Sequence, residues 1–281
     1  MAHAKVNAAA APELEEIEVE LFLVALFRRY GYDLRGHDPE LVHRYIRRRM
    51  REEELPTVSA LTERVLREPG ILERFLAQFN DSGGSLFGPA AFWRALRRKV
   101  VPFLRTYPSV RLWQIGGRPE EVFSLAILLH EDLPRHVQIY ATDIHDALLE
   151  AARSGALDAR KVAGGTREYR RSGGSGDLGS YFQRKSGESV LSDDLRRNIL
   201  FASFNPVTDG PFQRCHAVLA RTLFGPFNHE LRARAFRLLH DSLIPLGFLA
   251  LGSGDVLQES PYRDRYKEVS RAAGIYQKLG Q

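Results

Sequence analysis

The sequence predicts a doubly wound α/β sheet preceded by a small all-helical domain. Residues 13–80 carry apolar side chains at helical spacing. The apolar segment Val110–Ile115 runs into Gly116 and Gly117, which is typical of a buried strand that enters a glycine turn, and a second apolar strand ends on Asp143. Strand, glycine turn and helix in this order begin a doubly wound unit.

The composition bounds the class of protein. With 281 residues, 44% of them hydrophobic, the chain can bury the core of one large domain or two smaller ones. The single cysteine, Cys215, cannot form an internal disulfide, which indicates a reducing, cytoplasmic setting. The longest apolar run, Leu21–Phe27, is far shorter than the roughly 20 residues of a membrane-spanning helix, so we expect no membrane span.

The N-terminal part is expected to be a flexible tail over residues 1–12 and a helical domain over residues 13–80. The first helix, Glu13–Tyr30, should pack through one apolar stripe: Leu14, Ile17, Leu21, Val24 and Phe27. Asp38, Pro39 and Glu40 are typical of a helix start, which predicts a second helix to about Glu54. Two further helices are expected over Thr57–Arg67 and Pro69–Phe79.

The second helix carries a strongly basic face. Its arginines are Arg44, Arg47, Arg48 and Arg51. Arginine forms bidentate contacts with carboxylates, so this face is a candidate surface for a partner with an acidic surface. The alternative is a solvated face whose arginines pair with Glu52–Glu54 one turn away.

The rest of the chain, residues 81–281, is predicted to form the α/β domain. After the glycine turn a helix starts at Pro119, followed by a strand over Val137–Asp143 and a helix over Asp146–Arg153. A Gly/Ser-rich insert, residues 156–198, should form a loop or small subdomain before strands and helices resume at Ile199. Ligands of such sheets bind beyond the carboxyl ends of the strands, where Asp143 could take a ribose hydroxyl pair or simply cap the next helix.

Several strings resemble the CheR family, the methyltransferases that esterify glutamates of bacterial chemoreceptors. They are VRLWQIGGRPEEVFSLAILL, YATDIHDALLEAARSG, LRRNILFASFNPVTDGPF, ARTLFGPF and FLALGSGDVL, and the N-terminal RYGYDLRGHDPELVHRYIRRRM resembles the family's helical domain. The resemblance implies a Rossmann-like class I fold that uses S-adenosylmethionine, with a small inserted β-subdomain. It implies that the basic face of the second helix meets a chemoreceptor or another signalling protein.

The resemblance also implies a set of cofactor-binding residues. Asp143 matches the family's ribose-binding acid, Glu121 the second glutamate of the first motif, and Asn205 the asparagine near the adenine. Gly116 and Gly117 form the glycine turn, and Arg221 matches the arginine of an Arg-Asn pair. For Glu121 the alternative is an acid that stabilises a helix dipole, and for Asn205, which precedes Pro206, a turn residue.

The departures from the family concern catalysis. Gly88 stands in the place of an arginine near the reacting centre, and Pro226 in the place of a tyrosine thought to lie by the methyl group. Proline offers neither a hydroxyl nor an amide hydrogen. Losing one preorganised contact of this kind typically costs about 2–4 kcal/mol of barrier, so we name no catalytic residue.

Three functions remain open from the sequence. The first is a CheR-like pseudoenzyme that keeps the fold, and some affinity for S-adenosylmethionine or S-adenosylhomocysteine, but acts through protein contacts. The second is an active methyltransferase on receptor glutamates or a changed substrate. The third is a basic nucleic-acid-binding module, permitted by 40 basic against 35 acidic residues, although we expect no nucleic-acid partner. The nine histidines show no metal-ligand spacing, so no metal site is predicted.

Overall fold

The computed structural model describes most of the chain in two compact units. The first comprises residues 1–82 and 226–231, and the second residues 83–225 and 232–281. The described residues are 10–32, 34–35, 39–78, 84–116, 118–133, 136–143, 146–185, 187–206, 209–224, 227, 229–252, 257–258 and 260–280. The predicted flexible tail and the predicted helix cap at Asp38 therefore lie outside the described residues, apart from the backbone of residues 10–12.

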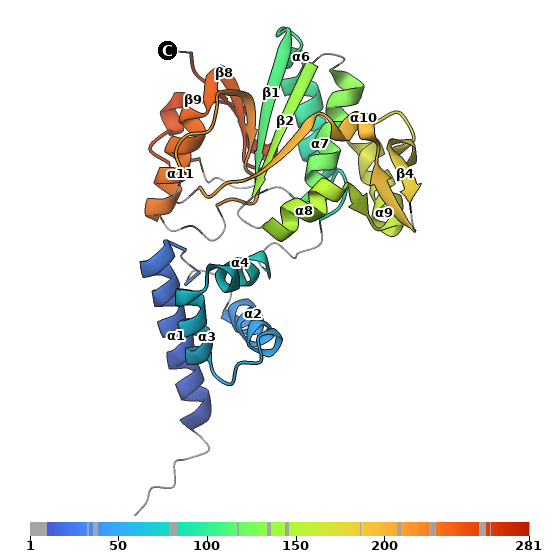
Figure 1. The fold of residues 1–281 in the computed structure, drawn as a ribbon. Helices are drawn as coiled ribbons and strands as arrows, with labels where there is room; N and C mark the ends of the chain where they lie inside the picture. Colours follow the sequence, from blue (N-terminus) through green and yellow to red (C-terminus); the bar gives the residue numbers. More distant parts are fainter. Residues whose placement is uncertain are drawn as a thin grey trace, which may run out of the picture. The chain divides into compact units, whose positions relative to one another are not determined.

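The first unit is built from helices α1 (Ala10–Tyr30), α2 (Pro39–Glu52), α3 (Val58–Arg67) and α4 (Pro69–Ala77) (Figure 1). α3 begins where the hydroxyl of Thr57 accepts a hydrogen bond from the amide of Ala60 at 3.1 Å, a typical N-cap. The rings of Phe22 and Phe75 meet edge to face at 5.0 Å in its core. The unit also contains a bridge between Tyr32 and Phe227, which lie far apart in the sequence.

The predicted packing face of α1 is wrong for its first half. Leu14, Ile17 and Leu21 are 58%, 54% and 59% exposed, whereas Val24 and Phe27 are half-buried. The buried side chains are Val19, Phe22 and Leu26, which lie on the opposite side of the helix. Both stripes have helical spacing; α1 contacts α3, and Phe22 of the buried stripe meets Phe75 of α4.

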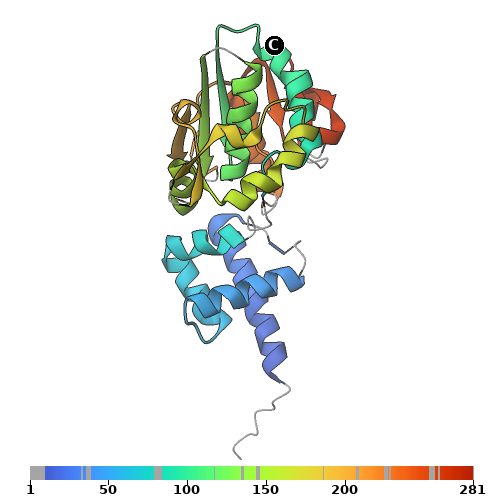
Figure 2. The same cartoon turned by 90° about the vertical axis from the view of Figure 1, so that its right-hand side faces the viewer.

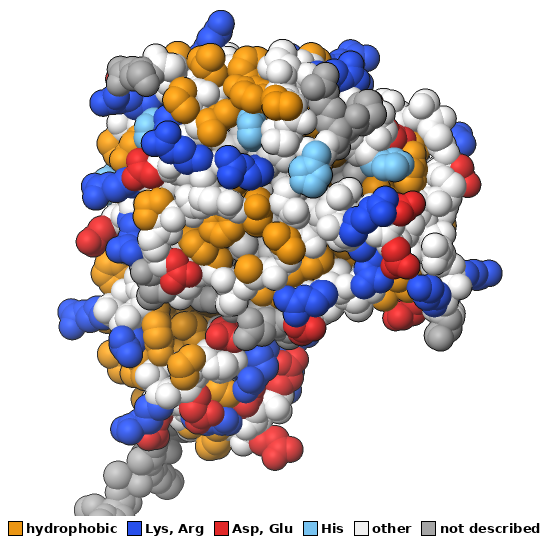
Figure 3. Space-filling model, turned by 45° about the horizontal axis from the view of Figure 1, so that its top comes forward, with side chains coloured by type: hydrophobic (Ala, Val, Ile, Leu, Met, Phe, Trp, Pro, Cys, Tyr) orange, Lys and Arg blue, Asp and Glu red, His pale blue; other side chains and the backbone are white. Residues whose placement is uncertain are grey.

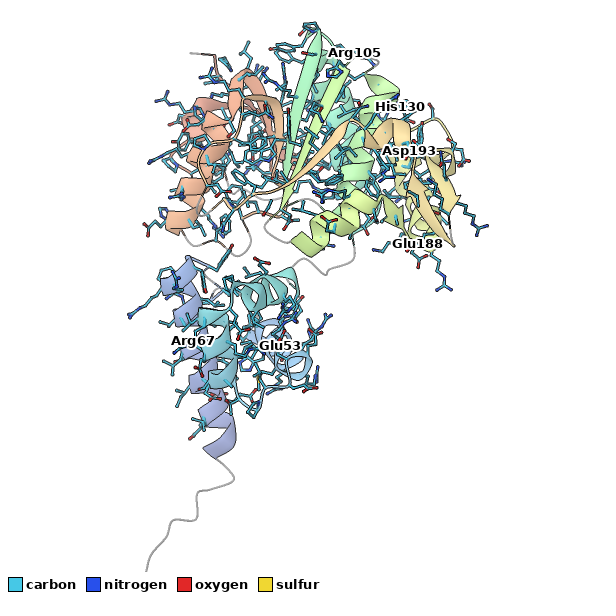
Figure 4. The ribbon with its side chains drawn as sticks, viewed as in Figure 1. Glu53, Arg67, Arg105, His130, Glu188 and Asp193 are labelled. Atoms are coloured by element: carbon cyan, nitrogen blue, oxygen red, sulfur yellow. The ribbon has the colours of Figure 1, made fainter. Side chains whose placement is uncertain are left out.

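A buried carboxylate holds the ends of the helices together. Glu53, which follows α2, accepts hydrogen bonds from Arg49 at 3.4 Å, Arg64 at 3.2 Å and Arg74 at 3.0 Å. Its side chain is 11% exposed. Figure 4 labels Glu53 among the helices of this unit. Arg49 is buried as well and donates to the carbonyl of Arg74 at 2.6 Å. These contacts join α2, α3 and α4 through charge-assisted hydrogen bonds.

The second unit contains a seven-stranded sheet in the order β6-β2-β1-β7-β8-β10-β9. Its first five strands are parallel, and β10 and β9 extend it in antiparallel fashion. The bounds are β1 (Ser109–Ile115), β2 (His136–Asp143), β6 (Ile199–Ser203), β7 (Cys215–Leu219), β8 (Leu243–Ala250), β9 (Tyr266–Ser270) and β10 (Ile275–Lys278). This order confirms the doubly wound class that the sequence predicted.

Helices pack against this sheet, as Figures 1 and 2 show. A helical stretch before β1 consists of α5 (Ala90–Ala95), a π-helical turn (Leu96–Val100) and α6 (Val101–Leu104). The others are α7 (Pro119–Asp132), α8 (Asp146–Ser154), α10 (Asp193–Arg196) and α11 (His229–Asp241), with short 3-10 turns η4 (Arg263–Arg265) and η5 (Arg271–Ala273). None of the described helices is both long and apolar enough to cross a membrane.

The insert forms a three-stranded antiparallel sheet, β3-β5-β4, with α9 (Ala159–Arg171) and the turn η3 (Leu178–Tyr181). Its strands are β3 (Ala156–Leu157), β4 (Phe182–Lys185) and β5 (Glu188–Leu191). Glu131 of α7 accepts hydrogen bonds from the hydroxyls of Tyr169 and Tyr181 and pairs with Arg97 at 2.7 Å. This network fixes the insert to the main sheet's helices.

Candidate functional site

The carboxyl ends of neighbouring parallel strands bring four predicted residues to one edge of the sheet. Gly116 follows β1, Asp143 ends β2, and Asn205 and Arg221 come just after β6 and β7. Because these strands lie in the order β6-β2-β1-β7, their ends form one continuous rim. This is the rim at which sheets of this class bind their ligands.

The glycine turn is held by both neighbouring strands. Gly116 has φ +68°, a conformation that favours glycine. Its amide donates to the carbonyl of Thr142 at 2.8 Å, and its carbonyl accepts a hydrogen bond from the hydroxyl of Thr222 at 2.7 Å. The backbone of Gly116 at the end of β1 is therefore fixed by the end of β2 and by the segment that follows β7.

Asp143 and Asn205 lie at the ends of paired strands. Asp143 is 4% exposed, and its carbonyl accepts a hydrogen bond from the amide of Phe204 at 3.0 Å. The amide of Asn205 donates to the carboxylate of Asp209 at 2.9 Å. The helix cap proposed as the alternative for Asp143 involves residues 144 and 145, which lie outside the described residues.

A buried ion pair joins Glu121 to Arg221. The two side chains are 12% and 13% exposed, and Arg221 Nη1 lies 2.8 Å from Glu121 Oε1. The same guanidinium donates to the carbonyl of Gly88 at 3.3 and 3.4 Å and lies over the ring of Phe92, 4.4 Å from its centroid. Gln114 donates to the other oxygen of Glu121 at 3.2 Å.

Burial dominates the electrostatics of this pair. Burial raises the pKa of Glu121, while the charges of Arg221 and Arg118 and the hydrogen bond from Gln114 lower it. The net direction is upward, so the carboxyl holds its proton more tightly than an exposed glutamate does. Glu121 is therefore more than the helix-dipole acid of the alternative reading, because it is a buried partner of Arg221.

Two buried polar atoms beside Glu121 lack a hydrogen-bond partner within the described part of the chain. They are Oε1 of Gln114, an acceptor, and Nε of Arg221, a donor. Buried polar atoms without a partner are rare and call for a ligand or water. The methionine end of S-adenosylmethionine carries an ammonium and a carboxylate, so an acceptor pair at Gln114 and Glu121 and a donor at Arg221 fit its chemistry.

The remaining predicted residues are distributed as follows. Gly88 is joined to the rim through the guanidinium of Arg221. Gly117 and Pro226 lie outside the described residues. The basic face lies on α2 in the helical unit, where Arg44, Arg47 and Arg51 line an open depression of about 620 Å³.

The basic face is partly paired. Arg47 lies 2.8 Å from Glu15 and Arg48 lies 2.8 Å from Glu52, with side chains 60% and 46% exposed. Pairs this exposed are weak, so they do not prevent the arginines from meeting a partner. The predicted pairing one turn away is thus found for Arg48, whereas Arg47 pairs with a neighbouring helix.

Sequence reasoning missed Gln114 and Phe92. A polar residue inside the apolar strand VRLWQI was the available signal for Gln114, because a buried amide needs partners. No local signal linked Phe92 to Arg221, since they lie 129 positions apart. Among the described residues no group of three or more metal-ligating side chains gathers in one place.

Two family models match the chain. The model described as "CheR methyltransferase, SAM binding domain" matches residues 85–273, and the one described as "CheR methyltransferase, all-alpha domain" matches residues 17–79. Together they cover most of both units and leave residues 1–16, 80–84 and 274–281 unmatched.

Two curated relatives match over nearly their whole length. "Putative methyltransferase Cher3" from Pseudomonas putida is 35% identical over 265 residues, which are 94% of this chain and 97% of the relative. "Chemotaxis protein methyltransferase 1" from Pseudomonas aeruginosa is 24% identical, over 92% of this chain and 96% of the relative. Among solved structures, a class I S-adenosylmethionine-dependent methyltransferase from Listeria monocytogenes, itself titled as putative, aligns with a TM-score of 0.42 at 9% identity, covering 96% and 89% of the two chains.

Proposed function

The chain belongs to the CheR methyltransferase family, and from this premise we propose that it is a signalling protein with weakened or lost methyl transfer. It keeps the site that binds the methyl donor S-adenosylmethionine, here called the donor site. Its larger domain is of the S-adenosylmethionine-binding type, so S-adenosylmethionine or S-adenosylhomocysteine is its ligand. We further propose that Gly116, Gly117, Asp143 and Asn205 hold the nucleoside end, and that Glu121 and Arg221 hold the methionine end. The protein then acts through contacts of its helical domain with another signalling protein.

One observation carries the proposal of weakened transfer: the guanidinium nearest to Gly88 is already engaged. Arg221 pairs with Glu121, donates to the carbonyl of Gly88 and covers the ring of Phe92. A guanidinium neutralised in this way offers little charge to an incoming substrate carboxylate. Gly88 itself has no side chain to supply the missing cation.

The chemistry explains why this matters. S-adenosylmethionine supplies an electrophilic methyl group on a sulfonium, which a carboxylate oxygen attacks while the sulfur leaves as a neutral thioether. Such a displacement needs little proton transfer, so the protein contributes mainly by aiming the two groups, and positioning can supply effective molarities of about 10⁵ M or more. A side chain that orients the carboxylate is therefore a large part of the catalytic effect.

The same contact favours a second candidate, an active methyltransferase. The guanidinium of Arg221 reaches the segment where the family's arginine is expected, within 3.4 Å of the carbonyl of Gly88. The ammonium group of bound S-adenosylmethionine could take the place of Arg221 as the partner of Glu121. The guanidinium of Arg221 would then be available to a glutamate of a chemoreceptor or of another substrate. The two candidates differ only in whether this exchange occurs.

Calorimetric titration with S-adenosylmethionine and S-adenosylhomocysteine tests the donor site. We expect the wild type to bind both ligands. Asp143→Ala should lose about tenfold or more in affinity, as for a lost charge-assisted hydrogen bond. Asp193→Ala should bind like the wild type. Asp193 is 74% exposed and lies away from the rim (Figure 4), which makes it a matched control. Absence of binding at millimolar donor would refute the donor site.

A second measurement separates the two candidates. Labelled methyl transfer to chemoreceptor fragments should be absent, or far below that of an active family member, if catalysis is weakened. Robust transfer by the wild type would instead establish the active enzyme. The two assays read binding and turnover independently.

We propose that the partner is a chemoreceptor or another signalling protein with an acidic surface, and that it meets Arg44, Arg47, Arg48 and Arg51. Reversing two charges, Arg47→Glu with Arg48→Glu, should weaken the complex and leave the thermal midpoint nearly unchanged, because both side chains are well exposed. Arg67→Glu on α3, 76% exposed, is the control. Equal binding by the control and the double variant would exclude this face as the contact.

A further inference from the structure

A small cavity of about 230 Å³ lies at the amino ends of β7 and β8, and four basic or titratable side chains line it. Arg214 precedes β7, His240 belongs to α11, Arg265 belongs to η4 and Lys278 ends β10. Leu243 and Pro245 provide part of an apolar wall. Four segments distant in sequence thus converge on one hollow.

This cavity is remote from the rim that carries the proposed donor site. Leu243 is the first residue of β8, whereas the proposed donor site lies beyond the carboxyl ends of the parallel strands. A strand of seven residues such as β1 spans about 20 Å. The cavity is therefore a separate site at the opposite end of the sheet.

Lys278 is held in place by backbone carbonyls. Its ammonium donates to the carbonyl of His240 at 2.7 Å and to that of Leu243 at 3.0 Å. These contacts neutralise one carbonyl at the C-terminal end of α11 and one at the start of β8, which would otherwise repel an anion. An ammonium has three donors, so one remains for a further acceptor in the cavity.

The charges in the cavity repel one another. Burial lowers the pKa of Lys278, and the charge of Arg214 lowers it further, against the opposing effect of Asp241. Burial also lowers the pKa of His240, with Lys278 and Arg265 acting in the same direction and Asp241 again opposing. None of the described residues that line the cavity is acidic.

The positive charge of the cavity lining differs from the mixed charge of the surrounding surface. On the face of the larger unit that Figure 3 shows, basic and acidic side chains are interspersed. A hollow lined by two guanidinium groups, an ammonium and an imidazole, with an acid only nearby, differs from that mixture. It concentrates a positive potential that an anion would relieve.

We infer that this cavity binds a compact phosphate-class dianion, either inorganic phosphate or the phosphate group of a small molecule. Two exposed guanidinium groups and one spare ammonium donor match a tetrahedral oxyanion, which accepts several charge-assisted hydrogen bonds. The volume is below the roughly 300–1,000 Å³ of sites for drug-sized ligands, which favours a small group. The apolar wall at Leu243 and Pro245 leaves room for the organic part of a phosphate ester.

The test uses the full chain with inorganic phosphate, and separately with adenosine monophosphate, at constant ionic strength with chloride as the reference. The double variant Arg214→Gln with Arg265→Gln removes two exposed cations and leaves Lys278, which is bonded to the end of α11, in place. The control is Arg263→Gln, in the same short turn as Arg265 but outside the cavity lining. The imidazole NMR signal of His240 reports binding locally.

Phosphate should bind saturably and shift the signal of His240. The double variant should bind about tenfold more weakly or worse, as for lost charge-assisted hydrogen bonds, and the control should bind like the wild type. Both affinities are read from the shift of the His240 signal, because the adenosine part could also bind at the rim. If adenosine monophosphate binds more than tenfold tighter than phosphate by this signal, the ligand is a phosphate ester, whereas equal affinity identifies free phosphate. Lack of saturation relative to chloride, or unchanged binding by the double variant, would overturn the inference.

Discussion

The variant Arg221→Met isolates the buried ion pair at the rim, because methionine keeps much of the side chain's volume without its charge. Glu121 and Arg221 are 12% and 13% exposed, so among the described residues the carboxylate left behind would be buried with Gln114 as its remaining hydrogen-bond donor. Removing one member of a buried pair typically costs about 3–5 kcal/mol of unfolding free energy. We expect about 3 kcal/mol at pH 8, because a protonated carboxyl can limit the loss.

The loss of stability in Arg221→Met should be larger at high pH than at low pH. Burial already holds the folded-state pKa of Glu121 above its ordinary value of 4.5. The folded state therefore binds the proton more tightly than the unfolded chain, and stability falls as pH rises from the unfolded pKa to the folded one. Without Arg221 the folded-state pKa rises further, and each added unit costs about 1.4 kcal/mol above that window.

Urea unfolding at pH 5 and at pH 8 measures both effects. Arg221→Met should lose markedly more stability at pH 8 than at pH 5, and adding Glu121→Gln should remove that difference because no carboxyl remains to titrate. A loss below about 1 kcal/mol at pH 8 would mean that solvent screens the pair, as for surface ion pairs. An equal loss at both pH values would refute the assignment of the effect to Glu121.

Two further perturbations test the rest of the fold by the same denaturation assay. Glu53→Gln should destabilise the helical unit by about 2–4 kcal/mol because three arginines lose their shared carboxylate. The control Glu63→Gln, at a site 68% exposed, should change stability by less than about 0.5 kcal/mol. Similar losses in the two variants would contradict the role of Glu53 in joining the helices. Gly274→Ala should cost several times more than Gly187→Ala, because both have positive φ but only at Gly274 would a new Cβ overlap the carbonyl oxygen of Gly252; equal unfolding midpoints would refute this.

The order of elements in the α/β part was predictable from local pattern. The apolar segments around Val110–Ile115 and Val137–Asp143 matched β1 and β2 to within one residue, because a buried parallel strand leaves a continuous hydrophobic signal. The start of the next helix at Pro119 was also correct, since proline favours the first helical position. Glycine and proline mark the ends of helices and strands through their own backbone preferences, so these signals do not depend on tertiary contacts.

The packed face of α1 could not be predicted in the same way. Leu14, Ile17 and Leu21 form a stripe as regular as the one through Val19, Phe22 and Leu26. Periodicity alone does not tell which stripe meets a neighbour, because that depends on where α3 packs. The burial of one stripe and the exposure of the other is decided by tertiary structure.

In the candidate site, too, some residues could be predicted from local pattern and others could not. Gly116 and Asp143 were identified because strand ends are marked in the sequence, and the structure brings them to one rim. The contact of Arg221 with Glu121 and Gly88 joins segments 100 and 133 positions apart. No pattern within one segment records such a contact, so the engagement of the guanidinium emerged only from the fold.

The return of residues 226–231 to the helical unit has a practical consequence for dissecting the protein. A cut after residue 82 would leave Phe227 on the other fragment, although its ring lies 6.0 Å from that of Tyr32 and both side chains are buried. A severed N-terminal piece would expose the aromatic surface of Tyr32 to water and invite aggregation. Residue ranges that are contiguous in the sequence are thus poor boundaries for producing the two halves separately.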